Sequence, residues 1–322
     1  MRILVTGAAG FIGSTVASLL MDNGHEVVGI DSLNDAYDAR IKDWRLARLQ
    51  ERPGLQFHRV DLSDVDELSD IVASSRAEAV VNLAARAGVR QSLENPWVYY
   101  ETNVTGTLNL LDLCRRHGVH KFVLASTSSL YGDSKAQPFR EDMPTDRPLS
   151  PYAASKKAAE SLTYTYHHSY GIDVTVLRYF TVYGPAGRPD MSIFRFIRWI
   201  AEGERVSVFG DGTQRRDFTY VDDIARGTVA ALKPLGYETI NLGNSQPASL
   251  LEVIALIEQA LGKKATISVE PPNPVDVPST WADNAKAARL LGWTPEVALA
   301  DGLQRTAKWY IENRELARSV RL

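Results

Sequence analysis

The sequence is poor in cysteine, in long apolar runs and in clustered basic residues, and each shortage excludes a class of protein. Its one cysteine, Cys114, can form no internal disulfide, which favours a protein of the reducing cytoplasm. No segment approaches the ~18 consecutive apolar residues of a membrane span, so we expect no membrane partner. The formal net charge of −3 and the scattered basic residues argue against nucleic acid as a partner.

What remains is a composition typical of a globular protein with a large core. The chain has 322 residues, of which 44% are apolar and 23% charged. Short apolar runs alternate with helical patterns, and they predict strands at 2–6, 26–30, 55–60, 79–85, 121–125 and 174–179 and helices at 14–23, 38–50, 64–74, 95–118 and 151–170. This alternation predicts an α/β fold with a doubly wound parallel sheet. We expect the basic residues of helix 38–50 to face solvent.

The alternation loosens after Phe180, where loops rich in glycine and proline separate shorter elements. We therefore expect residues 1–179 to form a nucleotide-binding domain and residues 180–322 to form a smaller α+β substrate domain. A strand-like segment near 217–245 is expected to return to the first sheet. Four prolines between positions 271 and 278 predict an irregular loop there.

A glycine motif follows the first predicted strand. Gly7, Gly10 and Gly13 let the backbone turn tightly and approach a pyrophosphate at the N-terminus of the next helix. The motif alone is weak, but it lies between a strand and a helix, as a nucleotide site requires. Asp31 ends the second strand, where a carboxylate accepts a hydrogen bond from a ribose 2′-OH and repels a 2′-phosphate. Because Ser32 beside it is neutral, NAD is favoured over NADP; the alternative for Asp31 is a solvated loop residue.

The stretch from Thr127 to Lys156 carries the candidate chemistry. If Pro151 begins a helix, Tyr152 and Lys156 lie on one face, four residues apart. A free phenol has a pKa near ~10, and a cation one turn away lowers it towards the range of a useful base. A hydroxyl from the preceding strand end could bond the same substrate oxygen. Tyr-x-x-x-Lys alone is usually a surface pair, but beside a nucleotide motif it predicts proton abstraction from an alcohol that also loses a hydride.

These motifs together resemble the extended short-chain dehydrogenase/reductases, a family of nucleotide-sugar epimerases, dehydratases and decarboxylases. The resemblance runs the full length of the chain and includes the run 216–223, which is similar to the family's substrate-domain signature. It implies a Rossmann domain that binds NAD and a second domain that binds a UDP-sugar. It also implies a homodimer that pairs helices 95–118 and 151–170 of two copies.

The same resemblance assigns roles to individual positions. It implies that Thr127 is the catalytic hydroxyl, Tyr152 the base and Lys156 its partner, with Ser128 and Ser129 beside them. The implied cofactor-binding residues are Gly7, Gly10, Phe11, Ile12, Gly13, Asp31, Ser32, Asp61, Leu62, Leu83, Ala84, Ala85, Asn103, Tyr152, Lys156, Tyr179 and Val182. The implied substrate-binding residues are Gly88, Arg90, Thr127, Ser128, Ser129, Thr181, Arg188, Met191, Ser192, Phe209, Arg216 and Asp276. No metal site is predicted.

Within the family, the runs 87–96 and 180–191 resemble the group that acts at C4 of UDP-glucuronate. In that group the arginine that matches Arg188 lies near the sugar carboxylate. The implied reaction inverts C4 to give UDP-galacturonate through a transient 4-keto sugar. Tyr152 would take the proton of the C4 hydroxyl while hydride passes to NAD, and Lys156 would hold the ribose and keep Tyr152 acidic.

Other reactions stay open at this point. A 4-keto glucuronate is a β-keto acid that loses CO2 easily, but the related decarboxylases and dehydratases have acidic residues where this chain has Ser128 and Ser129. A UDP-glucose/UDP-galactose 4-epimerase is opposed by Thr181 and Arg188. A catalytically silent NAD-binding regulator is opposed by the intact Thr127, Tyr152 and Lys156. The sequence departs from the group's pattern at three positions, Arg86, Ala186 and Asn273.

Overall fold

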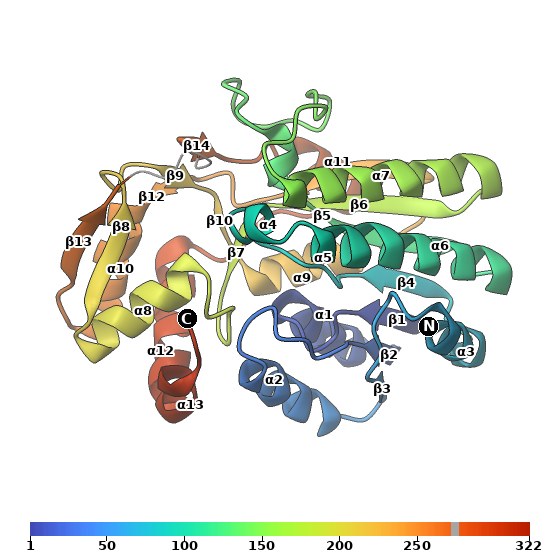
Figure 1. The fold of residues 1–322 in the computed structure, drawn as a ribbon, viewed down its shortest axis with the longest axis horizontal. Helices are drawn as coiled ribbons and strands as arrows, with labels where there is room; N and C mark the ends of the chain where they lie inside the picture. The colour runs from blue at the N-terminus through green and yellow to red at the C-terminus, as the bar shows by residue number, and fades with distance from the viewer. Residues whose placement is uncertain (272–276) are drawn as a thin grey trace.

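A twisted parallel sheet with helices on both faces forms the larger part of the molecule (Figure 1). The computed structural model describes residues 1–271 and 277–322. Within these ranges the sheet has seven strands in the order β11-β6-β5-β4-β1-β2-β3. They are β1 (Arg2–Thr6), β2 (Glu26–Ile30), β3 (Leu55–His58), β4 (Ala79–Asn82), β5 (Lys121–Thr127), β6 (Asp173–Tyr179) and β11 (Tyr237–Leu242). The predicted doubly wound Rossmann sheet is confirmed, and its strand order reverses between β1 and β4.

Successive residues of the buried strands serve two separate cores, because side chains alternate across a sheet. Leu4 lies in a core with α3 (Val65–Ser75), α6 (Gly106–His117) and α7 (Pro151–Tyr170). Its neighbours Ile3 and Val5 lie in a core on the other face with α1 (Phe11–Asp22), α9 (Val221–Ala230) and α11 (Ala285–Leu291). Cys114 is a buried free thiol in the first of these cores, as a small apolar residue would be. Among the described helices, none has the length and apolar character needed to span a bilayer.

The long helix predicted at 95–118 is divided in the structure. A short α5 (Trp97–Tyr100) leads into a π-helical turn, η1 (Glu101–Thr105), which continues as α6. Such turns insert an extra residue and are frequent at functional sites. Asn103 is buried within this turn, and an added Cβ at Gly106 would lie 2.8 Å from Cβ of Leu62. The turn therefore brings the helix close to the strand ends that follow β3 and β4.

The rest of the chain forms a smaller α+β region with its own core. Its helices are α8 (Ser192–Glu202), α10 (Leu250–Leu261), α12 (Leu299–Glu312) and α13 (Arg314–Ser319). Its short strands are β7 (Thr181–Tyr183), β8 (Arg205–Phe209), β9 (Arg215–Arg216), β10 (Phe218–Tyr220), β12 (Ala248–Ser249), β13 (Thr266–Glu270) and β14 (Ser279–Thr280). The sequence did not predict β7, β12, β13, β14, α11, α13 or the short α4 (Gln91–Glu94), since each is brief and lacks a clear period.

The expected return of the chain to the first sheet is observed. β11 pairs with β6 in parallel, and α9 and α11 pack on the same sheet. The boundary at residue 179 thus separates the two regions only in part, and the division into 1–179 and 180–322 stays a proposal.

One expectation about helix α2 (Arg40–Gln50) is wrong. Two of its basic residues, Lys42 and Arg45, are buried rather than solvated. The Arg45 guanidinium donates to the carbonyl of Ala186 at 2.6 and 2.9 Å and to the Tyr37 hydroxyl at 2.8 Å. Since Ala186 lies in the loop between β7 and α8, the helix turns its basic face towards the smaller region.

Candidate active site

A pocket opens at the carboxyl ends of the parallel strands, over the beginning of α1. The space between its walls, including the part open to solvent, is about 1040 Å³. Most of the predicted cofactor residues line it: Gly7, Gly10, Phe11, Ile12, Gly13, Asp31, Ser32, Asp61, Leu62, Leu83, Ala84, Ala85, Tyr152, Lys156 and Tyr179. The structure therefore gathers residues from the ends of six strands, β1 to β6, around one site, as a doubly wound sheet is expected to do.

The glycine loop gives this pocket its floor. A Cβ at Gly13 would lie 1.9 Å from the carbonyl oxygen of Gly7, so the strand and helix meet more closely than any side chain allows. Gly7 has φ +67°, a conformation that glycine adopts without strain. The cap of α1 at Gly10 carries no side-chain hydrogen bond, and its first residues line the pocket. The N–H groups at this end suit an anionic pyrophosphate.

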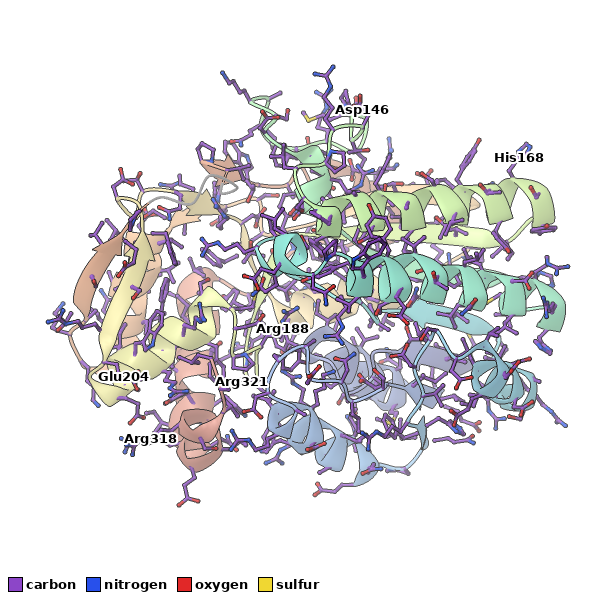
Figure 2. All side chains as sticks on the ribbon, viewed as in Figure 1. Asp146, His168, Arg188, Glu204, Arg318 and Arg321 are labelled. Atoms are coloured by element: carbon purple, nitrogen blue, oxygen red, sulfur yellow. The ribbon has the colours of Figure 1, made fainter. Side chains whose placement is uncertain are left out.

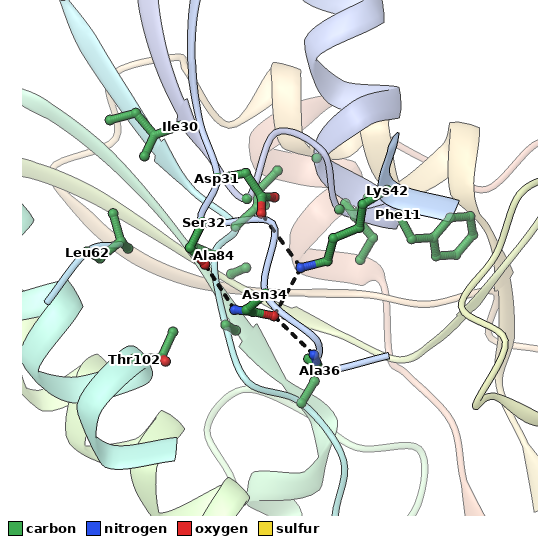
Figure 3. A pocket seen from close by; sticks show the side chains of 18 of the residues that line it. Phe11, Ile30, Asp31, Ser32, Asn34, Ala36, Lys42, Leu62, Ala84 and Thr102 are labelled. Carbon is green, nitrogen blue, oxygen red and sulfur yellow. Dashed lines mark hydrogen bonds and ion pairs between the residues drawn. The ribbon is translucent and has the colours of Figure 1, made fainter. Parts of the chain in front are cut away.

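Asp31 follows β2 next to the glycine loop and lines the same pocket, where Figure 3 shows it close to Lys42 and Asn34. Its carboxylate accepts hydrogen bonds from the N–H groups of Ala9 at 3.1 Å and Leu33 at 2.8 Å. The Lys42 ammonium is 3.6 Å from the same carboxylate and donates to Asn34 at 3.0 Å. Asp31 is thus a fixed, buried acceptor rather than a solvated loop residue, which fits the adenine ribose of NAD.

The sequence analysis missed several residues that line this pocket. They include Asn34, Ala36, Tyr37, Lys42, Ala87, Thr102 and Ser126. A buried lysine in a helix rich in basic residues gives no signal in the sequence, because burial depends on what packs against the helix.

Two predicted cofactor residues do not line the pocket. The Asn103 amide accepts from the Arg86 N–H at 2.9 Å and donates to the Arg86 carbonyl at 3.0 Å and to the Ser155 hydroxyl at 2.9 Å. It therefore holds the loop after β4 against α7. Val182 instead lines a smaller hollow next to the pocket.

The candidate catalytic residues come together where β5 meets α7. Ser150 caps α7 through the N–H of Ala153, which places Tyr152 in the first turn and Lys156 one turn later. The Tyr152 phenol is hydrogen-bonded to the Thr127 side chain. The Lys156 ammonium donates to the carbonyl of Ala125 at 2.8 Å. The end of β5 therefore holds both helix residues: Thr127 bonds the Tyr152 phenol, and Ala125 bonds the Lys156 ammonium.

Thr127 also organises the two serines that follow it. Its hydroxyl accepts the N–H of Ser129 at 3.1 Å and donates to the Ser129 hydroxyl at 3.1 Å. This caps the single turn η2 (Ser128–Tyr131). Ser128 and Ser129 begin this turn, are partly exposed, and stay at the end of β5, where Thr127 holds Ser129.

The expected acidification of Tyr152 by Lys156 is not what governs this site. Burial raises the pKa of the Tyr152 phenol, while the hydrogen bond to Thr127 and the charge of Arg188 lower it. Burial likewise lowers the pKa of Lys156 to about 8, against the opposing charge of Glu160. The helical spacing puts both residues at the site, but burial is the largest influence on the pKa of each, and Lys156 is not among the groups that shift the pKa of Tyr152.

Arg188 stands between the pocket and the smaller hollow, and Figure 2 shows it between the two regions of the molecule. Its guanidinium donates to the Asp190 carboxylate at 2.6 and 3.0 Å and to the carbonyl of Ala87 at 3.1 Å. It also lies 5.3 Å from the centre of the Tyr37 ring. The hollow is lined by three further predicted substrate residues, Thr181, Met191 and Ser192.

The remaining substrate candidates lie in three places. The Arg90 guanidinium stacks on the Phe209 ring with 4.2 Å between them, which joins the loop after β4 to strand β8. Gly88, with φ +132°, lies in the same loop as Arg90. Arg216 lies in β9 and donates to the carbonyl of Arg215 at 2.9 Å. Asp276, and the departing position Asn273, lie outside the described residues.

Comparison with known proteins agrees with this geometry. The profile of the NAD dependent epimerase/dehydratase family matches residues 3–243. A UDP-glucuronate 4-epimerase of Thermodesulfobacterium geofontis is 56% identical over 320 residues, which cover 99% of both chains.

Two solved structures extend the comparison. The UDP-glucuronic acid 4-epimerase of Bacillus cereus, in complex with UDP-glucuronic acid and NAD, has a TM-score of 0.91 and 40% identity over 97% of this chain and 100% of its own. The UDP-glucose 4-epimerase of Thermotoga maritima with UDP-glucose has a TM-score of 0.91 and 33% identity over 98% and 100%.

Proposed function

Because this chain belongs to the NAD dependent epimerase/dehydratase family, we propose that it inverts C4 of UDP-glucuronate to give UDP-galacturonate. NAD, when bound, would supply the hydride acceptor at C4 and the hydride donor that completes the inversion. The strand ends, the uncapped N-terminus of α1 and Asp31 are the parts of the chain that would hold this cofactor.

One observation carries the proposal: a guanidinium and a phenol face the same site. The charge of Arg188 acts on Tyr152, and Arg188 lines both the pocket and the adjoining hollow. A planar guanidinium is suited to a carboxylate, so the acidic sugar has a partner next to the proposed base. A neutral sugar has no carboxylate to bind this guanidinium, which would then keep only its ion pair with Asp190.

Tyr152 takes the proton of the C4 hydroxyl in this scheme. The Thr127 hydroxyl, already bonded to the phenol, shares the hydrogen bond to the sugar oxygen. Lys156, in its ammonium form, stabilises the phenolate that results and reaches the ribose side of the pocket. Thr127 and Lys156 are buried and Tyr152 is half-buried, so their charges act through a medium of lower polarity than water.

Decarboxylation is disfavoured because hydroxyls stand where an acid would be needed. Ser128 and Ser129 carry no charge and cannot serve as the carboxylic acid or base of the related decarboxylases and dehydratases. Arg188 would keep the sugar carboxylate ionised and out of alignment with the C4 ketone. The substrate-binding roles of Gly88, Arg90, Phe209 and Arg216 belong to the same proposal.

The deciding experiment incubates the protein with UDP-glucuronate and identifies the product by chromatography, with CO2 release followed in parallel. We expect UDP-galacturonate without CO2. A UDP-pentose with CO2 would indicate the decarboxylase, and turnover of UDP-glucose alone the neutral-sugar epimerase. Bound NAD without turnover of either sugar would indicate the silent regulator.

We also propose a homodimer in which α6 and α7 pair with those of a second copy, in the cytoplasm. These helices lie side by side (Figure 1), and apolar or aromatic side chains on and next to them are exposed: Trp97 by 80%, Leu108 by 39%, Tyr164 by 54% and Tyr170 by 51%. Leu108→Asp is expected to shift the protein from dimer to monomer in light scattering after size exclusion, because it would bury a charge. A monomeric wild type, or a dimeric variant, would contradict the proposed face.

A further inference from the structure

A buried ion pair lies behind the candidate active site and has no part in the scheme above. Glu160 of α7 and Arg178 of β6 are each 4% exposed. Arg178 donates from Nε and Nη2 to the two Glu160 oxygens at 2.9 and 2.8 Å. The Ser126 hydroxyl donates to the same carboxylate at 2.6 Å. Removing two charges from water costs several kcal/mol per ion, and their mutual attraction offsets that cost only in part. A contribution to stability therefore does not explain this pair, which points to another role at the site.

The pair belongs to one row of residues across three neighbouring strands. In the sheet register Ser126 of β5 is opposite Arg178 of β6, which is opposite Asn241 of β11. Arg178 also donates to the Tyr131 hydroxyl at 3.1 Å, and that hydroxyl donates to Asn241 at 2.7 Å. The row therefore fixes the carboxyl ends of β5, β6 and β11 relative to one another, one residue before Thr127.

On the helix side, the row reaches the candidate catalytic residues through α7. Glu160 follows Lys156 by four residues and Tyr152 by eight, so all three lie along one face of the helix. Lys156 is bonded to the carbonyl of Ala125 and Glu160 to the hydroxyl of Ser126. Two consecutive residues of β5 are thus tied to α7, and the next one, Thr127, is bonded to the Tyr152 phenol.

We propose that Glu160 is a positioning residue for Tyr152 and Lys156. With Arg178 and Ser126 it holds the end of β5 against α7, and its carboxylate supplies the negative charge that faces the Lys156 ammonium. The inference rests on the function proposed above, in which Lys156 acts as a cation.

The electrostatic part of the role follows from the surroundings of Lys156. Burial lowers the pKa of Lys156 to about 8, and the charge of Glu160 opposes that shift. The other titratable or charged groups around the site come from α7, β6 and the loop before α8: Tyr152, Arg178, Tyr179 and Arg188. Without the carboxylate, Lys156 would lose its proton at lower pH and could no longer stabilise a phenolate there.

The test titrates Lys156 directly in the NAD-loaded protein. Lysine is labelled with ¹⁵N, and the Nζ signal that disappears in Lys156→Arg is followed against pH. Glu160→Gln is expected to lower the midpoint of Lys156 by about one pH unit. The alkaline limb of kcat should move by the same amount. Because the titration needs no substrate, it stands even if UDP-glucuronate is not turned over, whereas failure of the proposed function shows as absence of product with the wild type.

A second variant guards against loss of the fold. Glu160→Gln leaves Arg178 as an unpaired buried cation, so Glu160→Gln/Arg178→Met removes both charges and should give a smaller shift in the same direction. Unchanged midpoints in these variants would overturn the electrostatic role. Ser126→Ala should lower kcat several-fold at constant NAD content without moving the midpoint, and an unchanged kcat would overturn the geometric role.

The chain offers a matched control at the opposite end of the same strands. Lys121 begins β5 and forms a partly buried ion pair with Asp173, which begins β6. Asp173→Asn leaves the buried Lys121 without its partner and should lower the melting temperature, but it should leave the Lys156 midpoint unchanged. A shift in this control equal to that of Glu160→Gln would show a general effect of sheet destabilisation and would overturn the proposal.

Discussion

Tyr152→Phe is expected to lower turnover of UDP-glucuronate by a factor of about 10²–10⁴, the range of general acid–base catalysis, while NAD stays bound. The substitution removes only the oxygen that accepts the proton. The ring remains and keeps its edge-on contact with Tyr99, whose centre is 6.1 Å away. The measurements are kcat by product chromatography and NAD content by absorbance of the denatured protein.

Tyr166→Phe is the control for this prediction. Tyr166 lies on the same helix and is partly buried against the core that Leu4 shares with α3, α6 and α7. It does not line the pocket. Its variant should keep normal turnover, which would show that loss of one phenol from α7 is harmless in itself. If Tyr152→Phe retained full activity, another group would have to be the base.

Arg188→Ala is expected to damage the reaction of UDP-glucuronate far more than that of UDP-glucose. A hydrogen bond to a charged group contributes about 1.5–3 kcal/mol, and about 1.4 kcal/mol is a factor of ten. The loss for the acidic sugar should therefore be about 10–100-fold in kcat/KM, with a much smaller loss for the neutral one. Dissociation constants of both sugars, measured by calorimetry, would show the same split if turnover of UDP-glucose is slow.

The geometry sharpens this prediction, because Arg188 already has a partner. Nε and Nη2 are directed to Asp190 and Ala87, so a sugar carboxylate must bind Nη1 or displace Asp190. Asp190→Asn weakens the internal pair and keeps the guanidinium, so it should preserve the preference for the acidic sugar. Equal losses for the two sugars in Arg188→Ala would end the carboxylate role.

The sequence predicted what depends on local pattern. Residue type and period predict the strands β1, β2, β4, β5 and β6, the glycine loop and the Tyr152–Lys156 spacing. The parallel pairing of these strands then places the glycine loop and the Tyr152–Lys156 pair at the same edge of the sheet. The π-helical turn η1 gave no signal, because the residues around Asn103 fit a continuous helix equally well.

Burial was the quantity that the sequence could not supply. Lys42 and Arg45 belong to a helix whose composition predicts solvent, yet each meets a partner that lies far along the chain or in a loop of unpredictable path. The same limit explains the error about Tyr152. Helical spacing predicts that Tyr152 and Lys156 lie one turn apart. Only the folded surroundings show that burial is the largest influence on the pKa of Tyr152.

The position of β11 has a consequence for how the protein is made. This strand covers the outer edge of β6, and it leaves the ribosome about sixty residues after β6 does. Until then, the nascent chain presents a row of unpaired backbone groups at that edge, which is the kind of surface on which chains associate wrongly. A fragment that stops at residue 179 lacks β11, so the outer edge of β6 would stay unpaired. We expect this fragment to precipitate under conditions in which the whole chain stays in solution.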